Sequence, residues 1–158
     1  MLKKILGLSF LPLNADVGLL LFRITFPFVM LRYHGWGKLT GWADESAGLP
    51  NLFSLEGARN EFHTFPNYIG ISSELSYVLV AWLETFGCIS IALGLATRLQ
   101  AFGLFIAMMV AWIFHHQMGF RAPHGGETAF LFAFGFLMLF LTGPGKYSLD
   151  RRYGIGRS

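Results

Sequence analysis

The sequence has only one cysteine, Cys88, among its 158 residues. A single cysteine makes no internal disulfide, and without a Cys-x-x-Cys motif the chain lacks the usual dithiol and zinc-binding patterns. These absences exclude a thiol relay of the quinone-linked, disulfide-forming kind. The simplest interpretation of Cys88 is a small side chain packed within a helix.

Charged residues are scarce as well. They make up 13% of this chain, against about 25% in ordinary soluble domains. Hydrophobic residues make up 54%, including 17 phenylalanines, which indicates a chain embedded in lipid. The sequence shows no Ser-His-Asp order, phosphate-binding loop or Gly-rich dinucleotide turn. Its basic C-terminal tail is too short to indicate nucleic-acid binding.

Four apolar segments are each near the length of roughly 20 residues that crosses a bilayer. They lie at about residues 16–39, 76–95, 99–118 and 128–142, with a long outer loop at 40–75 that is either a lid or a simple cap. The Phe-rich last segment is predicted as a helix, because a lone strand would leave its backbone groups unsatisfied in lipid. We therefore predict one all-α domain, residues 1–158, forming an up-and-down four-helix bundle that is integral to the membrane.

The strong bases predict the orientation of this bundle. They fall on one side of it: Lys3, Lys4, Arg98, Lys146, Arg151, Arg152 and Arg157. By the positive-inside rule that side is the cytoplasm, and both termini lie there. The first 14 residues resemble a signal peptide. However, cleavage after Ala15 would place the basic tail outside, so we expect them to be retained.

Glu84 stands well inside the second apolar segment. It shares one helical face with residues spaced three and four apart: Gly87, Cys88, Ile91, Gly94 and Arg98. Small residues on a membrane helix mark the face that packs against other helices, so Glu84 is expected to point into protein. An ionisable group there indicates function by default, the alternative being a buried ion pair that only fixes packing. As its counter-ion we expect Arg23 or Arg32, with Lys38 as a further contact.

The first apolar segment also has a polar face. It contains Arg23, Pro27, Met30, His34 and Lys38, and Pro27 is expected to kink the helix. Arg32 lies nearly opposite and is simply explained by snorkelling to the headgroups, as Lys38 could be. Counting depth along each helix predicts one pocket in the outer half of the bundle. Its walls would come from His34, Lys38, Glu84, one of the pair His115 and His116, His124 and Glu127.

The histidines do not predict a metal or haem site. Adjacent His115 and His116 point about 100° apart on a regular helix, so they cannot both bind one ion from the same face. His34 together with either of them could clamp a haem, but the spacing is not specific for haem. We therefore expect neither haem nor metal.

Three blocks of the sequence resemble the DoxX family in their order and spacing. They are Arg23 … His34-Gly35-x-x-Lys38-Leu39, then Glu84 … Gly94-Leu95-x-Thr97-Arg98, then Gly143-Pro-Gly-Lys-Tyr-Ser-Leu-Asp150. The resemblance implies a four-helix bundle in the bacterial inner membrane. It also implies a link to thiosulfate:quinone oxidoreductase, whose membrane subunit is similar. The motif positions carried over are Arg23, Lys38, Glu84 and Arg98.

The leading functional hypothesis is a membrane subunit of a redox system in sulfur or oxidative-stress metabolism, which binds a quinone or similar small apolar molecule. The chain has no recognisable electron carrier, so it would act with an oxidoreductase partner protein. Glu84 and His34 are the catalytic candidates, and the ligand-binding candidates are Arg23, Lys38, Arg98, His115 and His116. The alternative is a non-catalytic scaffold, client escort or small-solute transporter. The sequence alone decides neither whether the protein is an enzyme nor whether it forms a homo-oligomer.

Overall fold

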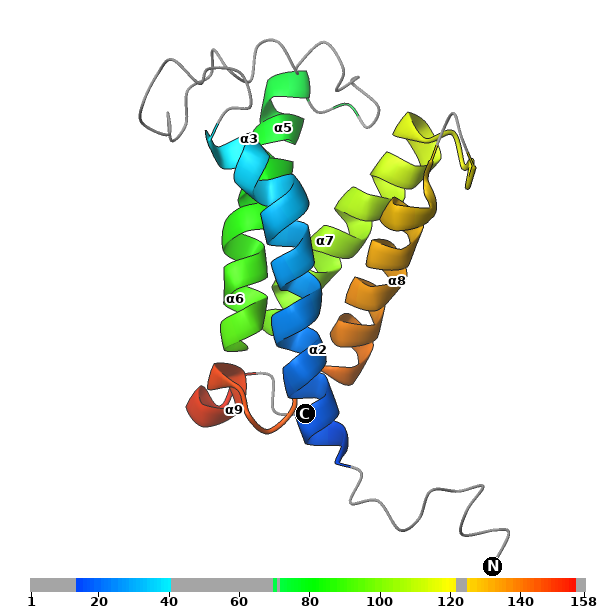
Figure 1. Ribbon diagram of the computed structural model, residues 1–158. Coiled ribbons are helices and arrows are strands. Elements are labelled where there is room, and N and C mark those ends of the chain that lie inside the picture. The colour runs from blue at the N-terminus through cyan, green and yellow to red at the C-terminus, as the bar shows by residue number, and fades with distance from the viewer. Residues whose placement is uncertain (1–13, 41–69, 71, 122–124, 156–158) are drawn as a thin grey trace, which may run out of the picture.

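A computed structural model describes residues 14–40, 70, 72–121 and 125–155, and every regular element in them is a helix (Figure 1). The predicted opening arm, most of the 40–75 loop and His124 lie outside these residues. The helices, with η marking π-helical turns, are α2 (Ala15–Met30), η1 (Leu31–Gly35), α3 (Trp36–Thr40), α5 (Ser73–Trp82), η2 (Leu83–Gly87), α6 (Cys88–Leu93), α7 (Thr97–Val110), η3 (Ala111–His115), α8 (Glu127–Thr142) and α9 (Leu149–Tyr153).

The four predicted apolar segments coincide with helical runs. Two of these, Leu75–Leu93 and Thr97–His115, are long and apolar enough to cross a membrane, and α8 is a shorter apolar helix. The first run, residues 15–40, is longer but has a charged side chain every six to nine residues: Asp16, Arg23, Arg32 and Lys38. Pro27 lies inside α2 without ending it.

The surface of the long helices is apolar. Leucines on three of them are among the most exposed large side chains, with Leu99 at 70%, Leu131 at 65% and Leu21 at 59%. By contrast, Ile91 and Phe136 in the core are fully buried. A contiguous apolar surface of this kind is unfavourable in water but is the natural surface of a protein surrounded by lipid tails.

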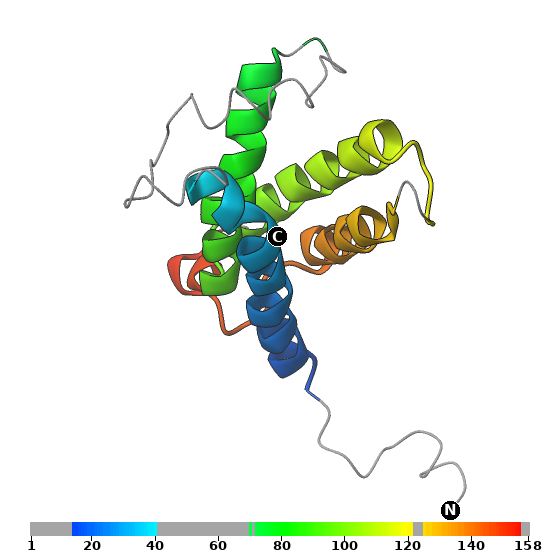
Figure 2. The ribbon, with the colours of Figure 1, turned by 45° about the horizontal axis from the view of Figure 1, so that its top comes forward.

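The helices form two groups that meet at one end. Figures 1 and 2 show α7 and α8 packed along each other and diverging from α2–α3 and α5–α6 towards one end of the molecule. We call that end the α3 end and the opposite one the α9 end. Aromatic side chains join α2 to α8: the Phe26 ring lies 4.8 Å from Phe132 and occupies the space where Gly135 has no side chain.

At the α9 end, a C-terminal segment, residues 143–150, links the start of α7 to the start of α2. The Asp150 carboxylate accepts hydrogen bonds from Ala96 N at 2.7 Å and Thr97 N at 2.9 Å, and so caps the start of α7. Lys146 reaches the first turn of α2, where its backbone N–H donates to Asp16 at 3.0 Å. This segment therefore determines how the helices sit relative to one another at this end.

Candidate functional site

A buried ion pair joins the first and second helical runs. Lys38 Nζ, on α3, lies 2.7 Å from Glu84 Oε2, on η2. The Glu84 side chain is 3% exposed and that of Lys38 is 17% exposed. The predicted contact between Lys38 and Glu84 is confirmed, and Lys38 is the counter-ion.

The pair is held by two π-helical turns that pack directly against each other. A side chain on Gly35, in η1, would overlap the backbone carbonyl of Glu84, in η2, so only glycine permits this approach. The Thr85 hydroxyl donates to the Ala81 carbonyl at 2.6 Å, next to where η2 interrupts the regular hydrogen-bond ladder. Single π turns are rare and occur frequently at functional sites.

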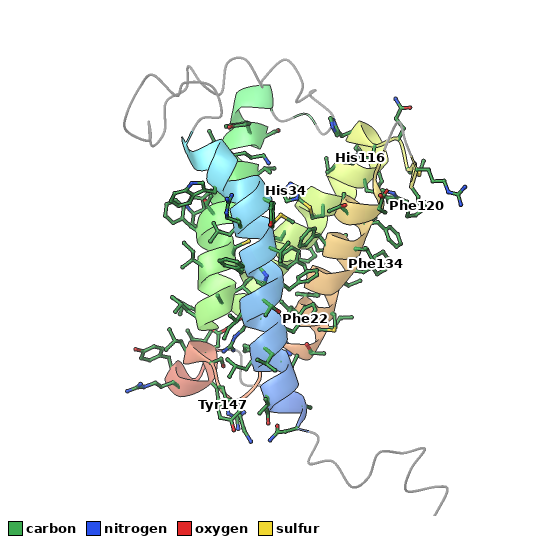
Figure 3. All side chains as sticks on the ribbon, viewed as in Figure 1. Phe22, His34, His116, Phe120, Phe134 and Tyr147 are labelled. Atoms are coloured by element: carbon green, nitrogen blue, oxygen red, sulfur yellow. The ribbon has the colours of Figure 1, made fainter. Side chains whose placement is uncertain are left out.

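His34 is the third polar residue of this site. It is half-buried on η1, and both charges of the Lys38–Glu84 pair act on its ring. Its ring lies edge-on to Phe132 of α8, with the centroids 6.0 Å apart. Figure 3 shows His34 in the half of the molecule nearer the α3 end, with Phe22 nearer the α9 end. An acid, two basic groups and an aromatic wall thus come together from three helical runs.

Tyr77 is a further residue beside the pair, and it was not predicted from the sequence. Its hydroxyl donates to the Lys38 backbone carbonyl at 3.3 Å, and its side chain is buried. This contact ties α5 to α3 just beyond the ion pair. Tyr77 precedes Glu84 by seven residues, so the two-turn spacing on one helix face was the available signal.

The prediction that Arg23 or Arg32 pairs with Glu84 is wrong. Arg23 is buried at the α9 end, where its guanidinium donates to the backbone carbonyls of Pro144, at 2.6 Å, and of Tyr147. Arg32 is exposed and lies over the Tyr33 ring at 5.6 Å, which suits the snorkelling interpretation. Arg23 lies almost four turns before Lys38 along the helix, and the C-terminal segment offers nearer acceptors.

Three other candidates lie at the two ends of the α7–η3 run. Arg98, near its start, is exposed, and its guanidinium packs over Gly143 at the end of α8. His115 and His116 lie at the other end, with their rings 4.9 Å apart and nearly perpendicular. Figure 3 shows His116 at the α3 end beside the α7–α8 connection. Their predicted roles in ligand binding stay predictions, as does the predicted pocket.

A metal site is not evident in the described part of the chain, which holds no group of three or more His, Cys, Asp or Glu side chains able to bind one ion. The site at Glu84 is instead an ion pair with a neighbouring imidazole. Such a set can donate hydrogen bonds to a carbonyl oxygen and can hold or release a proton.

The described residues form helices with an apolar surface, as is typical of a helical membrane protein. The chain belongs to the DoxX family, whose sequence model matches residues 18–117. It is 32% identical over 148 residues to the inner membrane protein YqjF of Escherichia coli K12, covering 86% of this chain and 92% of that protein. An uncharacterized protein of Haemophilus influenzae is 37% identical over 111 residues, or 65% of this chain and 82% of that one. No solved structure matches. The predicted family and inner-membrane location are confirmed.

Proposed function

We propose that the protein is a four-helix, up-and-down membrane bundle that binds a quinone or similar small apolar carbonyl compound beside the Lys38–Glu84 pair. In this proposal it serves as the membrane subunit of a redox system and acts with an oxidoreductase partner. The α9 end faces the cytoplasm. The observation that carries the proposal is the buried 2.7 Å ion pair, set with His34 in two facing π turns.

The residues at the pair suit a carbonyl-bearing ring. An ammonium group has three N–H donors, and the Lys38 ammonium uses one of them on Glu84. The others have no acceptor in the described part of the chain, so they are available to a ligand oxygen. His34 adds a further polar group, and Phe132 gives the apolar contact that small-molecule sites mostly provide.

The chemistry assigns Glu84 and Lys38 different roles. A quinone, when bound, takes up electrons and protons in equal number, and the electrons come from the partner protein. Lys38 and His34 hydrogen-bond the ligand oxygens and orient the ring. Glu84 takes up a proton, passes it to the ligand oxygen and so returns to the carboxylate that Lys38 stabilises.

Replacing Glu84 separates this role from a purely structural one. In the proposed role, Glu84→Gln keeps the shape of the side chain but cannot ionise, so it no longer holds the Lys38 ammonium in place for the ligand oxygen. The protein should stay folded while its affinity for a short-chain ubiquinone falls by about tenfold or more. The checks are thermal unfolding in detergent and a quinone titration on the same sample. Asp16→Asn, which changes an acid at the α9 end away from the pair, is the control and should bind normally.

The scaffold alternative predicts the reverse pattern. Removing one partner of a buried pair would then destabilise the fold by about 3–5 kcal/mol, and replacing both partners by apolar residues would restore much of it. The double variant Lys38→Met/Glu84→Leu tests this. A stable Glu84→Gln protein with unchanged quinone affinity would remove Glu84 from the proposed function.

A further inference from the structure

A second surface lies at the α9 end, away from the Lys38–Glu84 pair. We infer that this end is a docking surface for anionic phospholipid headgroups, formed by four basic side chains: Arg98, Lys146, Arg151 and Arg152. The inference rests on membrane insertion and on the α9 geometry, and it does not depend on quinone binding.

The position of the membrane boundary places these side chains at headgroup depth. Leu99 directly follows Arg98 and is 70% exposed, and Leu141, near the end of α8, is 66% exposed. Both leucines are lipid-facing if the helices cross a bilayer. Arg98 and the C-terminal segment continue from these leucines towards the α9 end, which is the level where phosphate groups lie.

The chain holds the basic groups facing outward. Ser148 caps α9 through a 3.2 Å hydrogen bond from Arg151 N, and Asp150 N donates to the Gly94 carbonyl at 2.8 Å. Asp150 therefore points into the protein and is 4% exposed, whereas Arg151 and Arg152 are exposed. Because α9 is fixed in this way, the backbone that carries the two arginines is already ordered before they bind.

The acidic groups of this end are already engaged. Asp16 pairs with Lys146 at 3.4 Å, and the Asp150 carboxylate caps α7. Among the described residues here, the exposed charges without an opposite partner are Arg98, Arg151 and Arg152. The surface is thus positively charged, as an anionic headgroup requires.

Exposed apolar side chains favour lipid over an acidic soluble partner. Tyr147 is 48% exposed, Tyr153 67% and Ile155 50%, and all three flank the arginines of α9. Tyrosine is favoured at membrane–water interfaces, and an exposed isoleucine gains by entering the acyl boundary. The arginines alone could bind either kind of partner, but the exposed tyrosines and isoleucine beside them suit a bilayer.

The test is a titration of the detergent-purified full chain with short-chain phosphatidylglycerol, followed by native mass spectrometry. Phosphatidylcholine of the same chain length is the uncharged reference. A basic residue near an anionic surface strengthens binding by a factor of about five. The variant Arg151→Ala/Arg152→Ala should therefore lose roughly 25-fold in phosphatidylglycerol affinity, and each single variant about fivefold.

The matched control removes the same charge elsewhere. Arg32→Ala/Arg121→Ala replaces two exposed arginines outside the α9 end and should keep the phosphatidylglycerol affinity. Unfolding midpoints without added lipid confirm that both double variants are folded. Equal losses in the two double variants, or no preference of the native chain for phosphatidylglycerol over phosphatidylcholine, would overturn the inference.

Discussion

At the residue scale, Arg23 is buried at 2% exposure without a carboxylate within ion-pair distance in the described residues. Its guanidinium is held by the carbonyls of Pro144 and Tyr147 and attracted by Asp150. Burying a charge is costly unless hydrogen bonds compensate it, so these contacts are required for the fold. The absence of a side chain at Gly94 leaves the space that the guanidinium occupies.

Gly94→Ala should therefore destabilise the fold strongly. A Cβ there would lie 2.6 Å from Arg23 Nη1 and 2.6 Å from Ser148 Cβ, at a backbone φ of +72°. Gly154→Ala is the control, because Gly154 has a φ of +70° but nothing within 4 Å of a Cβ. Both variants carry the backbone strain of about 1 kcal/mol, and we expect Gly94→Ala to lose some 2 kcal/mol more. Similar unfolding midpoints in detergent would show that Arg23 packing does not depend on Gly94.

The partners of single residues were only partly predictable. Lys38 and Glu84 could be expected to meet because both lie on helix faces that carry small or polar residues. The partners of Arg23 could not, since they are backbone carbonyls 121 and 124 residues further along the chain. Every residue type has a backbone carbonyl, so neither the spacing nor the composition of the sequence shows which carbonyl accepts a hydrogen bond.

At the element scale, each π turn rotates the part of the helix that follows it relative to the part that precedes it. In the first run the buried residues are Arg23, Pro27 and Met30, and the next is Gly35, five residues later. A regular helix would place position 34 there instead. The helices themselves were predictable from their apolar length, but the π turns were not. Gly35 therefore went unrecognised as the contact, and His34 lies at the edge of the interface.

Gly35→Ala tests whether the facing π turns hold the Lys38–Glu84 pair. The added methyl group would overlap the Glu84 carbonyl and push η1 and η2 apart. We expect a loss of about 1–3 kcal/mol, the usual cost of overpacking, together with weaker quinone binding. Gly18→Ala, in α2 with nothing within 4 Å, should instead be neutral or stabilising by up to about 1 kcal/mol. A Gly35→Ala protein as stable as the native one would mean that the two turns are not in close contact.

At the scale of the whole molecule, the exposed basic side chains at the α9 end contrast with the apolar surface of the long helices. This distribution underlies the proposed orientation with both termini in the cytoplasm. In a Cys88→Ala background, single cysteines at Ser54 and Ser158 should differ in their reactivity. An impermeant thiol reagent added to intact cells should label position 54 and leave position 158 unlabelled until the membrane is opened. Labelling of position 158 alone would invert the proposed orientation.

The C-terminal segment also has a consequence for biosynthesis. Arg23 leaves the ribosome 121 residues before Pro144, the first of its two carbonyl partners. At about 5–20 residues per second, that interval is on the order of ten seconds. During it the first helix must keep a guanidinium hydrated while it waits at the translocon. The nascent protein can therefore complete its α9 end only after the last helix has been released, and an early termination codon would leave that guanidinium without its two carbonyl partners.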